Sequence, residues 1–141
     1  MGGSSRKKEK RKHARIKVIL PLHFKMVENP NVYPGLTIDA SESGLLIQTL
    51  KDMPVKTRLN IEVSFPKGFE LSNFKGLAEI IWKDICNWEG WEAYMYGLKF
   101  IQISDENYLR LKQLLGDPTF RKEVELIDSP EHDATLIVKV E

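Results

Sequence analysis

The sequence has little of what builds cross-linked, metal-bound or membrane-spanning proteins. Its single cysteine, Cys86, cannot form an internal disulfide. The three histidines lie far apart, and no group of Cys and His residues has the spacing of a metal site, so we expect no metal. No apolar run approaches the ~20 residues that a transmembrane helix needs. A chain of 141 residues with one thiol is typical of a single cytoplasmic domain, and that is our expectation here.

The sequence also lacks the patterns that mark common enzymes. It has no glycine-rich phosphate loop, and no histidine stands in a recognisable catalytic context. Cys86 has no adjacent basic residue or paired histidine that would favour a reactive thiolate. We therefore predict no catalytic residue and no enzymatic activity.

The net charge of +1 hides a strongly basic N-terminus. Residues 1–17 hold eight Lys or Arg residues against Glu9 alone, a net charge of +7, whereas the remaining 124 residues have a net charge of −6. A basic arm before a mildly acidic body is expected to contact an anion. The arm could be solvated disorder, grip nucleic acid nonspecifically, or hold positions for a particular phosphate ligand. Charge alone favours the first interpretation.

Short strands are expected from the end of the arm to residue 103. Residues 16–26 alternate partly between apolar and polar side chains, and Pro21 indicates an edge position or a bulge. Turn residues such as Pro34-Gly35 separate the later apolar segments. The pattern predicts a small antiparallel barrel or sandwich. Its six strands are expected near 15–27, 36–39, 44–50, 59–65, 74–83 and 93–103.

The pattern changes at Ser104, which is a good helix N-cap followed by two acids. Leucines at helical spacing follow, and Gly116-Asp117-Pro118 ends the segment. We predict an amphipathic helix whose leucine face covers one end of the barrel. Residues 135–140 could form a strand or belong to a loose tail.

Two short motifs flank the first predicted strand. Arg11 and Arg15 form an RxxxR pattern, and after 23 intervening residues the run Asp39-Ala40-Ser41-Glu42-Ser43-Gly44 forms DxSxxG. Together with Tyr96-Gly97-Leu98-Lys99-Phe100 and the short helix, they resemble the PilZ domain, a family of bacterial receptors for the second messenger cyclic di-GMP. The resemblance covers roughly residues 10–115, and the joint occurrence of the two motifs in this order is specific.

The resemblance implies a mainly β fold, a six-stranded antiparallel PilZ-type β-barrel with a C-terminal helix. It divides the chain into a flexible basic arm (1–9), a PilZ domain (10–116) and a C-terminal extension (117–141). The implied ligand is cyclic di-GMP, with no other cofactor. The binding positions carried over from the family are Arg11, Arg15, Asp39, Ser41 and Gly44.

The chemistry of these residue types suits that ligand. A guanidinium can meet guanine O6 and N7 with two hydrogen bonds, contact a phosphate, or stack on a purine. A carboxylate can accept from the guanine N1–H and N2–H₂ groups. A serine hydroxyl can donate to a phosphate oxygen, and glycine permits close backbone approach or a positive φ.

Other interpretations stay open for the same residues. The arginines could be ordinary members of the basic arm, and Asp39 with Ser41 could form an Asx-turn. Trp82, Trp88 and Trp91 are expected to pack in the core or in loops rather than to stack on a ligand. Gly97 is expected at a close contact between a strand and a loop.

We predict a receptor or adaptor that signals to a downstream effector protein of unknown identity. The alternatives are a PilZ-like protein-interaction module without ligand binding, or a small nucleic-acid-binding β-barrel. The acidic body disfavours nucleic acid. The connection 83–92, with two tryptophans, and the C-terminal extension are candidate surfaces for the effector.

Overall fold

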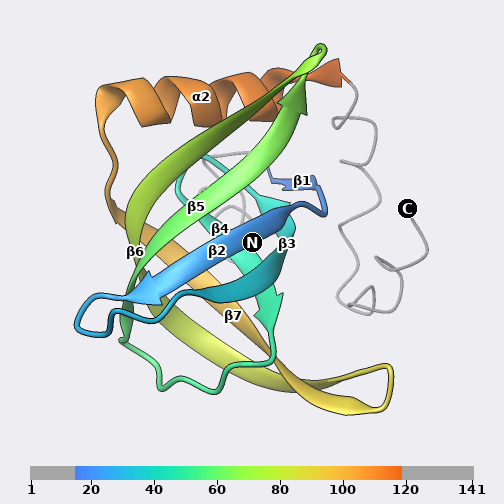
Figure 1. The fold of residues 1–141 in the computed structure, drawn as a ribbon, viewed down its shortest axis with the longest axis vertical. Coiled ribbons are helices and arrows are strands. Elements are labelled where there is room, and N and C mark those ends of the chain that lie inside the picture. The colour runs from blue at the N-terminus through green and yellow to red at the C-terminus, as the bar shows by residue number, and fades with distance from the viewer. Residues whose placement is uncertain (1–14, 119–141) are drawn as a thin grey trace, which may run out of the picture.

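The computed structural model describes residues 15–118, which form seven strands and one helix, α2 (Figure 1). All strand pairs are antiparallel, and the mainly β fold with a C-terminal helix is confirmed. The elements are β1 (Ile16–Lys17), β2 (Pro21–Met26), β3 (Tyr33–Ala40), β4 (Gly44–Thr49), β5 (Arg58–Lys67), β6 (Glu70–Trp88), β7 (Trp91–Gln102) and α2 (Asp105–Gly116).

The strands β2 to β7 form a closed ring. β3 pairs with β2 and with β4, and β4 pairs in turn with β7. β7 pairs with β6, β6 with β5, and β5 with β2, so each of the six strands has two neighbours. This closure is the six-stranded barrel that the sequence predicted, and it leaves no open sheet edge around the ring.

The first predicted strand, 15–27, is divided into β1 and β2. Both strands pair with β3 on the side opposite β4, and residues 18–20 between them form no strand. The hydroxyl of Thr37 bridges this interruption, because it accepts from the Leu20 N–H at 2.9 Å and donates to the Val18 carbonyl at 2.6 Å. Pro21 begins β2 directly after the interruption, where its missing N–H removes no interior ladder bond.

The expectation of a long connection at 83–92 was wrong. β6 continues to Trp88 and β7 begins at Trp91, so these residues are the end of one long hairpin. Its turn is Glu89-Gly90, where both residues have positive φ (53° and 85°). A two-residue turn of this kind matches the twist of the strands that it joins. The Asn87 side chain supports the turn by accepting from the Gly90 N–H at 3.0 Å.

Alternate side chains of the strands fill the barrel with apolar groups, including the fully buried Phe24 and Phe74. Tyr96 is also fully buried in this core, and its side chain carries a hydroxyl group. Its hydroxyl donates to the Lys51 carbonyl at 2.7 Å and accepts from the Met53 N–H at 2.7 Å. Burial raises the pKa of Tyr96 to about 12. The tyrosine therefore ties the segment after β4 to the core.

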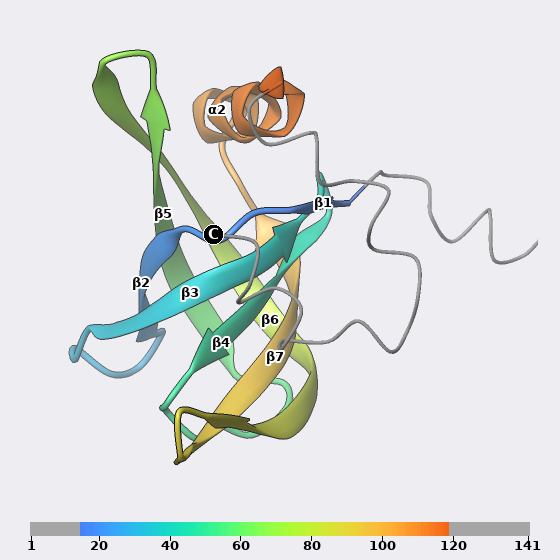
Figure 2. The ribbon, with the colours of Figure 1, turned by 90° about the vertical axis from the view of Figure 1, so that its right-hand side faces the viewer.

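Helix α2 lies across one end of the barrel (Figures 1 and 2). Ser104 caps it as predicted, with its hydroxyl accepting from the Asn107 N–H at 3.2 Å. Leu111 and Leu114 are fully buried in the core cluster, which confirms that the leucine face packs against the barrel. No helix within residues 15–118 is long and apolar enough to cross a membrane.

Candidate functional site

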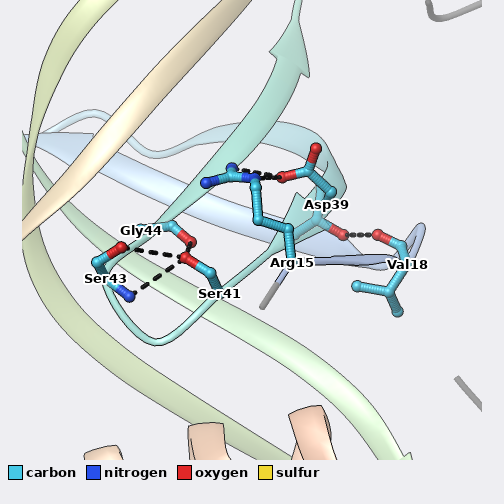
Figure 3. Close-up of polar contacts among 7 residues, drawn as sticks. Arg15, Val18, Asp39, Ser41, Ser43 and Gly44 are labelled. Atoms are coloured by element: carbon cyan, nitrogen blue, oxygen red, sulfur yellow. Dashed lines mark hydrogen bonds and ion pairs between the residues drawn. The ribbon is translucent and has the colours of Figure 1, made fainter. Parts of the chain in front are cut away.

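Four of the five predicted ligand-binding residues lie together at one end of the strands (Figure 3). Arg15 immediately precedes β1, and β1 pairs with β3 so that Lys17 lies opposite Asp39. The connection from β3 to β4 is only three residues, 41–43, because β3 runs to Ala40 and β4 begins at Gly44. Arg11 lies outside the described residues.

Arg15 and Asp39 form an ion pair. The guanidinium donates from Nε at 3.0 Å and from Nη2 at 2.5 Å, and both bonds end on Oδ1 of Asp39. The side chain of Asp39 is 7% exposed and that of Arg15 is 37% exposed. Charge-assisted bonds of this length are strong, and limited exposure weakens screening by salt. Asp39 is thus a strand residue paired with an arginine, and the Asx-turn interpretation is wrong for it.

Ser41 is a turn residue. Its Oγ accepts from the Ser43 N–H at 3.2 Å and lies 3.2 Å from the Ser43 hydroxyl. The Ser41 N–H donates to the Gly44 carbonyl at 2.9 Å, which closes the loop. The Ser43 carbonyl in turn accepts from the Phe100 N–H of β7 at 2.9 Å. The serine side chain therefore shapes its own loop, and a phosphate at Ser41 would have to exchange with these partners.

Gly44 is required by a close backbone contact. An ideal Cβ at this position would lie 2.0 Å from the Leu98 carbonyl oxygen of β7. Among residues 15–118, positive φ at glycine occurs only at Gly68 and Gly90. Because the obstructing atom belongs to the backbone of a paired strand, moving it aside would cost free energy by disturbing the pairing of that strand. Gly44 fixes the loop tightly against β7.

A row of residues leads from Asp39 across the outer face of the barrel. The strand register places Lys17 beside Asp39, Asp39 beside Leu46, Leu46 beside Gly97, and Gly97 beside Trp82. Directly opposed residues of neighbouring strands project on the same face. The row therefore connects the ion pair on β3 with an indole ring on β6.

The indole of Trp82 rests on Gly97. A Cβ at Gly97 would lie 2.3 Å from Nε1 of Trp82, so the glycine makes room for the ring. The expected contact of Gly97 was with a loop, and the structure places a side chain of the neighbouring strand there instead. Trp82 is 44% exposed and lies within β6, so for this tryptophan the expected packing in the core or in a loop was wrong. The bulge between Ile80 and Trp82 sets this register.

A second contact to the loop was not predicted from the sequence. Oε1 of Glu42 accepts from the Tyr108 hydroxyl of α2 at 2.5 Å, across 66 residues of chain. This hydrogen bond raises the pKa of Tyr108 above its ordinary value, because a proton shared with a carboxylate is harder to remove.

No group of three His, Cys, Asp or Glu side chains that could hold a metal ion occurs within residues 15–118. The site is instead an arginine–carboxylate pair, a compact serine loop and an exposed indole on one face. These groups can offer bidentate donors, an acceptor and a stacking surface. Such a set suits a planar, anionic ligand with both donors and acceptors.

Comparison with known proteins identifies the fold. The family model of the PilZ domain matches residues 9–117, whereas no curated protein matches the chain. Among solved structures, the Bacillus subtilis inhibitor of motility MotI/DgrA is similar with 16% identity and a TM-score of 0.60, over 74% of this chain and 48% of that one. The PilZ domain of YcgR from Escherichia coli, solved with cyclic di-GMP, has 15% identity and a TM-score of 0.57, over 82% and 92%.

The Borreliella burgdorferi PlzA protein, solved in complex with cyclic di-GMP, has 14% identity and a TM-score of 0.54, over 79% of this chain and 55% of that one. This chain thus spans about half the length of MotI/DgrA and of PlzA, and nearly all of the YcgR domain. Identities this low show a shared fold. The match of the family model over most of the chain also shows the family, and this protein belongs to the PilZ domain family.

Proposed function

We propose that this protein is a receptor for cyclic di-GMP. The observation that carries the proposal is the Arg15–Asp39 ion pair next to the Ser41 loop, because it joins residues of the two separate family motifs in one site. The family membership supports it, as do the two similar folds that were solved with this ligand.

The proposed recognition is an exchange of partners. Guanine presents an acceptor pair, O6 and N7, to a guanidinium, and a donor pair, N1–H and N2–H₂, to a carboxylate. Arg15 and Asp39 now satisfy each other, with both bonds on one carboxylate oxygen. A bound guanine, or a guanine together with a phosphate, would replace one or both of the Arg15–Asp39 hydrogen bonds. The guanidinium and the carboxylate would then each still have a partner.

Trp82 extends the proposed site. Its ring atoms Nε1, Cδ1 and Cε2 occupy the space where a Cβ of residue 97 would be, and the side chain is exposed on the same row as Asp39. Three strand spacings of about 4.8 Å separate the two residues, roughly 14 Å in all. We assign the indole to stack on a guanine of the ligand, since every purine has a π-face that aromatic rings can cover.

The basic arm would close the site. Residues 6–14 combine little apolar content with high like charge, so they gain little on their own from ordering. The two phosphodiester charges of cyclic di-GMP would neutralise part of this repulsion and give Arg11 a fixed partner. We propose that ligand binding orders the arm and thereby changes a surface that a downstream effector protein reads.

A candidate surface for the effector is the end of the β6–β7 hairpin. Ile85 and Trp91 are large apolar residues there, and Trp91 is 70% exposed. The alternative function, a protein-interaction module without ligand binding, would use the same surface. One observation favours that alternative, namely that the Ser41 hydroxyl is already engaged within its own turn.

Calorimetric titration of the purified protein with cyclic di-GMP tests the proposal. GTP and cyclic GMP serve as controls, because they carry guanine and phosphate without the cyclic dinucleotide. We expect saturable binding of cyclic di-GMP alone. Absence of binding, or equal binding of the mononucleotides, would contradict the receptor function and leave the interaction module.

A further inference from the structure

Helix α2 contacts the loop of residues 41–43, which contains Ser41, and also covers one end of the barrel. Glu42 stands between Ser41 and Ser43, and its carboxylate accepts from the Tyr108 hydroxyl at 2.5 Å. Tyr108 lies in the first turn of α2, ahead of the buried Leu111 and Leu114 that fix the helix on the core. Because the helix is anchored independently, the tyrosine hydroxyl is a fixed point to which the loop is attached.

The loop is thereby attached to two different elements at neighbouring residues. The Ser43 carbonyl accepts from the Phe100 N–H of β7, while Glu42 contacts α2. A three-residue connection with both attachments has little freedom left. Ser41 lies directly before them, and its hydroxyl, which accepts from the Ser43 N–H, keeps one orientation. Binding groups that are fixed in advance lose less conformational entropy when a ligand arrives.

The hydrogen bond between Tyr108 and Glu42 also affects where the Glu42 carboxylate lies. Glu42 is an anion in the loop where the proposed ligand would bring two phosphodiester charges. A carboxylate that could turn toward the ligand would repel it, and the repulsion between like charges is strong at short range. The hydrogen bond to Tyr108 directs the Glu42 carboxylate toward α2.

We propose that Tyr108 is a positioning residue for the ligand site, acting through Glu42 on the Ser41–Gly44 loop. The inference rests on the proposed function as far as cyclic di-GMP is concerned. It adds α2 to the elements that determine affinity. By linkage, a ligand that binds the held loop also strengthens the contact between the loop and α2.

A double-mutant cycle tests this role. The affinity for cyclic di-GMP is measured by calorimetry for the wild type, Tyr108→Phe, Glu42→Ala and the double variant. We expect Tyr108→Phe to weaken binding about threefold to tenfold when Glu42 is present, as for the loss of one hydrogen bond. The same substitution should have no effect in the Glu42→Ala background. An equal loss in both backgrounds would overturn the proposal.

Met53→Ala is the matched control for stability. Met53 is a fully buried core residue in the segment after β4, whereas the loop 41–43 precedes β4, so the new cavity lies at the other end of this strand. The control should lower the melting temperature more than Tyr108→Phe does, and we expect its affinity for cyclic di-GMP to equal that of the wild type. If affinity falls in step with melting temperature in both variants, a general loss of stability explains the weaker binding and the specific role of Tyr108 is refuted.

Hydrogen exchange of the protein without ligand separates this inference from the proposed function. The amides of Ser43 and Gly44 should exchange faster in Tyr108→Phe than in the wild type, whether or not cyclic di-GMP binds. If the wild type binds no cyclic di-GMP but exchange accelerates, the receptor function fails and the attachment of the loop stands. Unchanged exchange at both amides would overturn the attachment itself.

Discussion

Arg15 directs two nitrogen atoms at a single carboxylate oxygen of Asp39, 24 residues further along the chain. The pair joins the residue that precedes β1 to the end of β3 and places a guanidinium beside a carboxylate (Figure 3). A guanidinium and a carboxylate, which are able to pair with opposite edges of guanine, therefore already lie side by side. This relationship determines what substitutions at either residue should do.

Arg15→Lys should weaken binding of cyclic di-GMP by about 1–3 kcal/mol. Lysine keeps the charge but lacks the planar fork that makes two bonds to a guanine edge. Arg58→Lys is the matched control, because Arg58 pairs with Glu79 in the sheet between β5 and β6. Calorimetry should show wild-type affinity for the control. Equal affinity of Arg15→Lys and the wild type would remove the specific role of this arginine.

Asp39→Ala should weaken binding while the protein stays folded. The side chain belongs to no part of the apolar core, and the exposed part of the Arg15 side chain can turn to water when its partner is lost. We expect a loss of thermal stability of a few degrees, measured by differential scanning calorimetry, with a clear loss of affinity. A collapse in melting temperature with unchanged affinity of the folded molecules would assign Asp39 to stability alone.

Leu111→Ala and Leu114→Ala should each lower the free energy of unfolding by roughly 2–5 kcal/mol, because both side chains are fully buried against the barrel. Leu109→Ala, on the same helix but 61% exposed, is the control and should change stability by less than about 0.5 kcal/mol. Urea titrations measure all three. Similar small effects in the three variants would mean that α2 does not close the core.

Gly44→Ala and Gly97→Ala should behave differently. The new methyl at residue 44 meets a backbone carbonyl of β7, so we expect a severe loss of stability. At residue 97 it meets the partly exposed Trp82 ring, which can swing away. Gly97→Ala should therefore fold with nearly normal stability but bind cyclic di-GMP more weakly. Thermal unfolding and titration of both variants distinguish these outcomes, and normal binding by a stable Gly97→Ala would argue against stacking on Trp82.

Much of the fold could be predicted because local signals agreed with one another. Alternation of apolar residues marked the strands, and Ser104 with the following leucines marked the helix. The length of the β6–β7 hairpin could not be predicted. Its turn needs positive φ at Glu89, which is a conformation that glutamate seldom adopts, so the sequence there resembles a longer loop.

The site was predictable only where its residues are close in the chain or belong to a known motif. Ser41 and Gly44 share one loop, but the atoms that they contact depend on how β7 packs against it. The position of Trp82 over Gly97 depends on a bulge that no local pattern marks. The contact between Glu42 and Tyr108 is purely tertiary, because it joins the loop of residues 41–43 to a helical residue 66 positions later.

Hydrogen exchange with and without cyclic di-GMP tests the central claim most directly, because it reports where the ligand binds and whether the arm responds. We predict slower exchange at residues 11–16 and 39–44, with the amides of β5 nearly unaffected, and a protection that fades as salt rises. GTP at the same concentration should leave all of these amides unchanged. Tight binding of cyclic di-GMP with no protection at residues 39–44 would contradict the assigned site, and unchanged exchange at residues 12–14 would contradict the ordering of the arm.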